Sequence, residues 1–230
     1  MKYYFLSNSI NRKLIGRYPQ SESLSTESNI FTFKQHEEIT KDSILPEPIL
    51  HVRSKLTAYI QSVPVNNLRF LILRNDFISF LKTYKINNFQ YWGLTMYQNK
   101  NNKSIDNYSL FHIHESYQEK YVDYKKSNFH IKKIGDNNSK KTVNINSYEE
   151  YCNLLEFLRE EDQNLMMCSE KLILDFNKAT DDIFRLSNMP YLGSGYYVSE
   201  RLKNAIEEKS FTGMVFQEIE EMDKRIKVIY

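Results

Sequence analysis

Two histidines stand at a spacing that metal sites use. His112 and His114 flank a single residue of an expected β-strand, so both imidazoles leave the same face of that strand. His130 or Glu115 would have to supply a third ligand, and neither lies at a spacing typical of a metal motif. A strand with one polar face gives the same pattern without any metal. The residues leave open a metal- or small-molecule-binding protein, or an enzyme, centred on His112, His114 and His130.

The two cysteines indicate neither a nucleophile nor a disulfide framework. Cys152 lies beside the apolar face of an expected helix and Cys168 follows two methionines, so both suit small buried side chains. The sequence contains no CxxC pair, nucleophile elbow, phosphate-binding loop or HExxH helix. We therefore expect no cofactor, and reduced cysteines in an intracellular protein.

Composition excludes several classes of protein. The chain has 230 residues, of which 41% are hydrophobic and 14% aromatic, which is too apolar for a disordered chain. Its 31 Lys and Arg residues nearly balance 29 Asp and Glu residues, whereas a dedicated nucleic-acid-binding protein would carry a strong positive excess. No apolar run approaches the roughly 18 residues that span a bilayer. We expect neither nucleic acid nor a membrane as a partner.

The expected elements give an α+β fold, with a mixed or antiparallel sheet and flanking helices. Residues 1–50 are expected to form an irregular segment that contains an edge strand at 2–6, a loop at 21–29 and a short strand at 30–34. Residues 51–230 are expected to form a single domain.

Apolar spacing predicts the main elements of that domain. One amphipathic helix is expected at 51–62, and another begins after Ser147, where Glu150 completes a capping box. Runs of β-branched and aromatic residues predict further strands, at 108–115, 121–124, 129–134, 142–145 and 172–174. We expect the first four of these to form an antiparallel meander.

One pattern occurs twice, in residues 68–96 and 193–219. Each copy predicts a strand, a helix and a second strand, at 71–73, 74–85 and 89–92 in the first copy and at 196–198, 199–209 and 214–216 in the second. Residues suited to a tight reversal coincide as well, with Asn88 in one copy opposite Gly213 in the other. The pattern predicts two strand–helix–strand units of similar structure.

Charge is distributed unevenly along the chain. Lysines are frequent between 120 and 141, and acidic residues follow on the helix after Ser147: Glu149, Glu150, Glu156, Glu160, Glu161 and Asp162. Those expected to meet a partner are Glu149, Glu156, Glu160, Glu161 and Asp162. Most such runs are solvated helix faces. The alternative is that this helix meets a basic partner, because complementary charge raises the association rate and selects the partner.

The C-terminal third carries strings that resemble a bacterial family of immunity proteins from polymorphic toxin systems, first catalogued as a domain of unknown function. The strings are Asp-x-Phe-Arg at 182–185, Val-Ser-Glu-Arg-Leu-Lys at 198–203 and Thr-Gly at 212–213, and an Asp-x-x-x-Ser turn at 123–127 is also similar. The residues that carry the resemblance are Asp123, Ser127, Asp182, Phe184, Arg185, Ser199, Glu200, Arg201, Thr212 and Gly213.

This resemblance spans residues 68–218 and implies a non-enzymatic cytoplasmic protein that binds a cognate toxin and occludes its active cleft. Most of the signature residues suit structural roles: Ser199 can cap a helix and Gly213 permits a reversal. Arg185 follows two aspartates, so it would either form a buried pair or present its guanidinium to a partner. A structural module that forms homo-oligomers is a third interpretation, and the oligomeric state stays open.

Overall fold

The computed structural model describes residues 1–29, 38–66, 70–98, 103–114, 117–136, 139–187, 189 and 194–230, and it confirms the α+β class. The strands are β1 (Tyr3–Asn8), β2 (Ser21–Leu24), β3 (Pro48–Leu50), β4 (Tyr59–Ile60), β5 (Leu71–Arg74), β6 (Phe89–Gln98), β7 (Lys103–Ile113), β8 (Asn128–Lys133), β9 (Lys141–Val143), β10 (Leu165–Asp175), β11 (Ile183–Leu186), β12 (Gly195–Ser199), β13 (Met214–Glu218) and β14 (Ile226–Ile229). The helices are α1 (Arg12–Ile15), α2 (Asn75–Leu81), α3 (Gln118–Tyr121), the 3-10 helix η2 (Tyr124–Lys126), α4 (Tyr148–Glu161), α5 (Glu200–Glu208) and α6 (Ile219–Met222). The strand expected at 30–34 lies outside the described residues.

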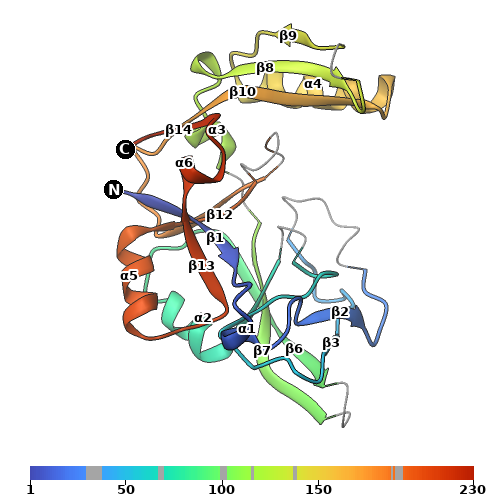
Figure 1. Ribbon diagram of the computed structural model, residues 1–230, viewed down its shortest axis with the longest axis vertical. Helices are drawn as coiled ribbons and strands as arrows, with labels where there is room; N and C mark the ends of the chain where they lie inside the picture. The colour runs from blue at the N-terminus through green and yellow to red at the C-terminus, as the bar shows by residue number, and fades with distance from the viewer. Residues whose placement is uncertain are drawn as a thin grey trace.

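The strands form three sheets (Figure 1). An antiparallel central sheet has the strand order β11-β12-β1-β13, and an outer sheet has the order β14-β10-β8-β9. The third sheet, with the order β2-β3-β6-β7-β5-β4, is called the barrel sheet below. One hydrophobic core joins the central sheet to the outer sheet, and a second core joins it to the barrel sheet. Both faces of the central sheet are therefore buried.

The first strand is an interior strand, so the prediction of an edge strand in residues 1–50 is wrong. β1 pairs antiparallel with β12 on one side and with β13 on the other. Tyr3 and Phe5 enter the core on one face of the sheet and Leu6 enters the core on the other. The continuous apolar run at Tyr3–Leu6 reflects this burial of both faces, because an edge strand with one wet face would alternate.

Both expected strand–helix–strand units are present and share one topology. The strands β5 and β6, which flank α2, lie on either side of β7, and the strands β12 and β13, which flank α5, lie on either side of β1. The strand inserted between them, β7 in the first unit and β1 in the second, is antiparallel to both of its neighbours. A further antiparallel strand pairs with the first strand of each unit, β4 in one and β11 in the other. The helices of both units contribute to the same core, where Phe211 contacts Phe77 at a ring-centroid distance of 4.7 Å.

The reversal after each helix uses a positive φ, as the turn residues predicted. Asn88 has φ 49° and Gly213 has φ 102°. The Asn88 carbonyl accepts a hydrogen bond from the His114 amide (3.2 Å), and the Gly213 carbonyl accepts one from the Ser9 amide (3.0 Å). Both turns are thus tied to the end of the inserted strand.

Replacing Gly213 by alanine is expected to destabilise the fold. A Cβ at this position would lie 2.1 Å from the Tyr59 carbonyl oxygen, and the positive φ adds backbone strain that costs about 1–3 kcal/mol. Gly93→Ala is the matched control, because an added Cβ there has nothing within 4 Å. Chemical denaturation should show a lower midpoint for Gly213→Ala only. Equal midpoints for the two variants would contradict the packing of this turn.

The barrel sheet closes on itself. A bridge between Ser21 and Ser62, with a hydrogen bond from the Ser21 amide to the Gln61 carbonyl (3.1 Å), joins the ends of β2 and β4. Its interior contains a third core, to which Leu50, Met96 and other buried residues contribute. The loop expected at 21–29 is therefore wrong in part, because the polar residues at 21–24 satisfy their backbone groups in this ladder.

The helix expected at 51–62 is wrong. Its segment holds no helix before β4 and is tied instead to residues 15–20, with hydrogen bonds from the His51 amide to the Gln20 carbonyl and from the Lys55 amide to the Ile15 carbonyl (both 2.9 Å). Val52, which the prediction placed on a buried helix face, is 49% exposed. Backbone hydrogen bonds to residues 15–20 therefore determine the structure of this segment, although its apolar residues are spaced as in a helix.

The strand expected at 121–124 is also wrong, because α3 and η2 occupy this region. Tyr117, Tyr121 and Tyr124 are buried at helical spacing, and the rings of Tyr117 and Tyr121 are stacked at 5.5 Å. The meander is broken at this point. β7 belongs to the barrel sheet, whereas β8 and β9 form an antiparallel pair in the outer sheet.

Candidate partner-binding surface

The helix α4 forms where its cap and its apolar spacing predicted it. The Ser147 hydroxyl accepts a hydrogen bond from the Glu150 amide (3.1 Å), and the Glu150 carboxylate accepts one from the Asn146 amide (2.7 Å), one residue earlier than in the usual capping box. Tyr151 and Leu158 are buried in the core that joins the central and outer sheets. The helix is therefore held by one face while the opposite face meets solvent.

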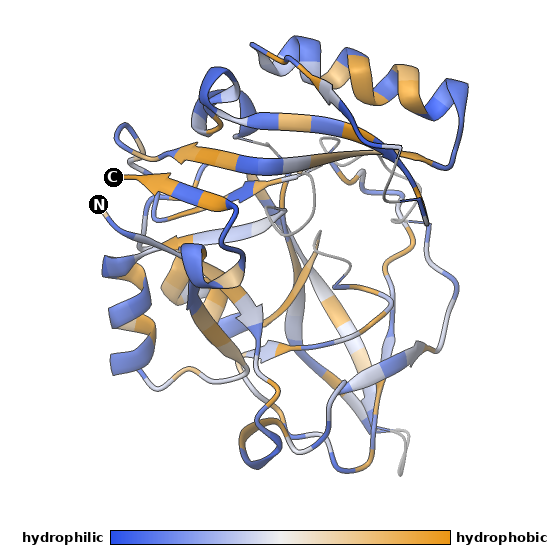
Figure 2. Cartoon of the chain, turned by 45° about the horizontal axis from the view of Figure 1, so that its top comes forward, coloured by the Kyte–Doolittle hydropathy of each residue, from blue (hydrophilic) through white to orange (hydrophobic). Residues whose placement is uncertain are grey.

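The solvent-facing side of α4 carries an aromatic ring among carboxylates. Six exposed residues at spacings of three and four form this side, which we call the α4 outer face: Glu149, Asn153, Glu156, Phe157, Glu160 and Glu161. Phe157 is 53% exposed. Figure 2 shows hydrophilic and hydrophobic residues side by side along this helix. Within the described residues, none of these glutamates takes part in an ion pair.

Two of the acidic residues oppose the helix dipole. Glu149 lies in the first turn, where a negative charge is favourable, but Glu160 and Glu161 lie in the last turn, beside the partial negative charge of the helix end. Charges at such positions typically change helix stability by about 0.3–1 kcal/mol each. The acidic C-terminal half of the outer face is thus not explained by the stability of α4.

Asp162, which the sequence grouped with these glutamates, has a local role. Its Oδ1 atom accepts hydrogen bonds from the amide and the side-chain nitrogen of Asn164, both at 2.8 Å, and these bonds lower the pKa of Asp162. Lys133 lies 3.9 Å away. Asp162 therefore closes the turn after α4 and does not belong to the outer face.

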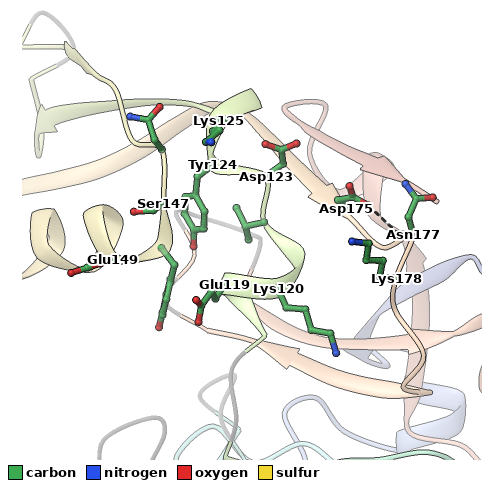
Figure 3. Close-up of a pocket in the computed structure, with 13 residues that line it drawn as sticks. Glu119, Lys120, Asp123, Tyr124, Lys125, Ser147, Glu149, Asp175, Asn177 and Lys178 are labelled. Carbon is green, nitrogen blue, oxygen red and sulfur yellow. Dashed lines mark hydrogen bonds between the residues drawn. The ribbon is translucent and has the colours of Figure 1, made fainter.

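An open cleft of about 580 Å³ adjoins the N-terminal end of the outer face (Figure 3). Ser147 and Glu149 line it on one side of Tyr124, and Asp175 and Lys178 lie on the other side. Within the described residues the Tyr124 hydroxyl is buried without a hydrogen-bond partner, and burial raises the pKa of Tyr124. Tyr124 and charged residues of both signs line the cleft, which therefore suits a polar side chain of a protein partner better than an apolar ligand.

The structure separates His130 from His112 and His114, with which the sequence grouped it. The ring of His112, in β7, and the ring of His114, one residue beyond the end of β7, lie close together with centroids 6.2 Å apart, but His112 is fully buried against Phe70. His130 lies in the outer sheet, where burial and the nearby cations Lys140, Lys132 and Arg225 lower its pKa. Among the residues that the structure describes, no group of three or more His, Cys, Asp or Glu side chains could hold a metal ion. Glu115 lies outside the described residues.

The signature around Asp182 joins both strand–helix–strand units. The Asp182 carboxylate accepts hydrogen bonds from the Ser199 hydroxyl (2.7 Å), the Arg201 Nε (3.1 Å) and the Lys85 amide (3.0 Å). Ser199 also caps α5 by accepting a hydrogen bond from the Leu202 amide (3.2 Å). Burial disfavours the ionised form of Asp182 and acts to raise its pKa. The hydrogen bonds from Arg201, Ser199 and Lys85 have the larger combined effect, so the pKa of Asp182 lies below its usual value.

The other C-terminal signature residues are structural as well. Phe184 is fully buried and stacks on Tyr197 at 5.5 Å, and Glu200 accepts a hydrogen bond from the Tyr4 hydroxyl (3.3 Å). The Thr212 carbonyl, beside Gly213, accepts a hydrogen bond from the Tyr59 amide (3.2 Å).

Arg185 lies inside the protein. It is 1% exposed, so it does not present its guanidinium to a partner, and the ion pair of Asp182 is made with Arg201 instead. Burial lowers the pKa of Arg185, and a hydrogen bond to Tyr196 opposes that effect. Arg185 therefore belongs to the packing between β11 and β12 rather than to a binding surface.

The Asp-x-x-x-Ser turn connects η2 to the outer sheet. The Asp123 side chain accepts a hydrogen bond from the Lys126 amide (3.1 Å) and pairs with the Lys126 ammonium group (2.8 Å), and this pair lowers the pKa of Asp123. The Ser127 hydroxyl donates to the Asp123 carbonyl (2.7 Å) and accepts from the Ile173 amide (2.9 Å). The signature residues thus explain how the fold is held and do not mark the surface that meets a partner.

No protein-family model matches the chain, and no curated protein matches it. In the part of the chain that the structure describes, no helix is long and apolar enough to cross a membrane.

Two residues of this surface, Asn153 and Phe157, were not predicted from the sequence, and the aromatic one is Phe157. It lies one residue after Glu156 and three and four residues before Glu160 and Glu161, which is the spacing of a single helix face. The signal that could have identified Phe157 from the sequence is an aromatic residue at the centre of an acidic helix face. It was hidden because Leu154, Leu155 and Leu158 surround it in the sequence.

Proposed function

We propose that this chain is a non-catalytic immunity protein, which binds a cognate bacterial toxin in the cytoplasm and occludes the toxin's active cleft. The α4 outer face is the surface that binds the toxin. The observation that carries this proposal is the half-exposed Phe157 ring among glutamates that form no ion pair with any residue the structure describes. The resemblance of the signature strings to polymorphic-toxin immunity proteins supports the same function.

The chemistry of the outer face fits a basic partner. An aromatic side chain that enters a pocket on the partner supplies most of the affinity at a typical binding hot spot, and charges around it set the association rate and the choice of partner. The outer face offers Phe157 as the anchor and its glutamates as the surrounding charges. Toxins that cleave nucleic acids need a basic cleft to hold phosphates. A toxin of that class is therefore the partner that we expect.

The cleft beside α4 extends this surface. It begins at Glu149 and reaches Lys120 and Lys178, so it can hold a side chain of either charge. A binding surface that combines a protruding ring with an adjacent cleft gives two points of contact. Two contacts fix the orientation in which the toxin is blocked.

Affinity capture of the tagged protein from its host, followed by co-expression of the captured partner, tests the proposal. We expect one stoichiometric polypeptide that is toxic when expressed alone and harmless when expressed with this protein. Recovery of a homo-oligomer without a partner would favour the structural module. Recovery of a partner that is not toxic would contradict the immunity function.

Charge removal at the C-terminal end of α4 is expected to separate stability from binding. The variant Glu160→Gln/Glu161→Gln should gain stability, by about 0.3–1 kcal/mol for each charge, because it removes an unfavourable interaction with the helix dipole. Its association rate with the captured partner should fall roughly 3- to 10-fold at low salt, because two steering charges are lost. Denaturation and surface plasmon resonance measure the two effects.

The matched control is Glu149→Gln, at the opposite end of the same helix. This variant should lose stability, because a carboxylate in the first turn is favourable. An unchanged association rate for Glu160→Gln/Glu161→Gln would show that the partner does not approach the acidic face.

A further inference from the structure

A second charged surface lies far from α4, where α1 meets the segment at 52–56. Five exposed cationic residues gather there from two distant parts of the chain: Arg12, Lys13, Arg17, Arg53 and Lys55. Figure 1 shows α1 in the lower half of the molecule and α4 at its top. The two surfaces are therefore separate sites.

Close backbone contacts hold the two cationic segments together. The Lys55 amide donates a hydrogen bond to the Ile15 carbonyl (2.9 Å), and the Lys55 ammonium group donates one to the Lys13 carbonyl (2.8 Å). Gly16 has φ 79°, and a Cβ at this position would lie 1.9 Å from the Arg53 carbonyl oxygen. Only glycine allows this approach, so the fold places Arg53 beside the end of α1.

Three arginines line one groove at this junction. The groove has a volume of about 270 Å³, and its lining consists of Arg12, Gly16, Arg17, Tyr18 and Arg53, with no carboxylate among them. In the described part of the chain, none of the three guanidinium groups has an acidic partner within ion-pair distance. Like charges that share a groove repel one another, and a bound anion would relieve that repulsion.

The lining residues indicate the kind of anion. The planar guanidinium fork of arginine matches the oxygens of a phosphate group and binds them in a bidentate manner. Tyr18 is 41% exposed and offers an aromatic face at the edge of the groove. The groove is slightly smaller than typical small-molecule sites, which begin at roughly 300 Å³, so it suits a compact anionic group. We propose that this arginine groove binds a diphosphate group, either free or as part of a nucleotide whose base contacts Tyr18.

Calorimetric titration of the full chain with pyrophosphate, ADP, adenosine and citrate tests this inference. We expect 1:1 binding of pyrophosphate and ADP and none of adenosine. Tighter binding of ADP than of pyrophosphate, lost in Tyr18→Ala, would identify the nucleotide as the source of the diphosphate. Citrate supplies a comparable negative charge without phosphate geometry, so equal binding of citrate would overturn the proposal.

The variant Arg17→Gln/Arg53→Gln should weaken pyrophosphate binding at least 10-fold. Arg159→Gln/Lys171→Gln removes the same charge from exposed positions elsewhere and should bind as the wild type does. Arg12→Gln provides a second test at the third arginine if the double variant unfolds. No heat with either diphosphate, unchanged binding in the arginine variants, or preferential binding of a single-stranded oligonucleotide without terminal phosphates would each overturn the assignment.

Discussion

Phe157→Ala is expected to abolish most of the affinity for the toxin while leaving the fold intact. Truncation of an aromatic anchor at the centre of an interface typically costs about 2–4 kcal/mol, which is roughly a 30- to 700-fold increase in Kd. Phe157 is 53% exposed in the free protein, so its removal should change the free energy of unfolding only slightly. Titration calorimetry with the captured partner measures the Kd, and growth of cells that co-express the toxin measures protection.

The matched control for this experiment is another half-exposed aromatic residue. Tyr91 is 45% exposed in β6 of the barrel sheet, away from the α4 outer face. Tyr91→Ala should bind and protect as the wild type does. A folded Phe157→Ala variant that keeps its affinity for the captured partner would exclude the outer face as the proposed toxin-binding surface.

The elements that could be predicted from the sequence are those whose determinants are local. The helix α4 has its cap at Ser147 and its apolar face within a few residues, and α5 is preceded by Ser199 and followed by the reversal at Gly213. Such signals act within one or two turns, so they survive in any tertiary setting. The two strand–helix–strand units could be predicted for the same reason.

The elements that could not be predicted depend on contacts between distant segments. Residues 51–58 have helical apolar spacing, yet their backbone groups pair with residues 15–20, and nothing in the local sequence reports that pairing. The interior position of β1 likewise depends on β12 and β13, which come from the other end of the chain. Local spacing is a weak guide where long-range pairing decides the structure.

The proposed binding surfaces also differ in whether their residues are close together in the sequence. The acidic residues of α4 are neighbours in sequence, so their charge could be recognised before the fold was known. Arg12, Arg17 and Arg53 come from separate segments that only the fold brings into one groove. The histidines show the reverse case, since His112 and His130 suggested one site by residue type although their strands belong to different sheets.

Asp182→Ala is expected to be the most destabilising of the substitutions considered, with a loss of about 3–5 kcal/mol. The Asp182 carboxylate has no exposed surface and accepts hydrogen bonds from Ser199, Arg201 and the Lys85 amide. Its removal leaves the buried Ser199 hydroxyl and the Lys85 amide without their carboxylate acceptor, so only the backbone bonds of residue 182 to Lys85 and Ser199 still link α5 to the turn that follows α2. Urea denaturation monitored by circular dichroism measures the loss.

The control is Asp76→Ala, which removes an acidic residue from an exposed pair. Asp76 binds Arg74 at 2.7 Å, but its side chain is 58% exposed, and exposed pairs contribute no more than about 1 kcal/mol. A loss for Asp76→Ala as large as that for Asp182→Ala would contradict the assignment of Asp182 as the buried link between the two strand–helix–strand units.

The charge of Asp182 also predicts how stability depends on pH. Its pKa lies below the unfolded value of about 3.9, so between the two pKa values the unfolded chain binds more protons than the folded chain. The stabilisation by Asp182 is therefore complete above the unfolded pKa and is lost as the pH falls through the folded pKa. Asp182→Asn removes this titration and keeps the shape of the side chain. Its stability should change less steeply than that of the wild type below pH 4. An acid-unfolding profile parallel to the wild type would show that folding leaves the pKa of Asp182 unchanged, which would contradict the carboxylate bonds described here.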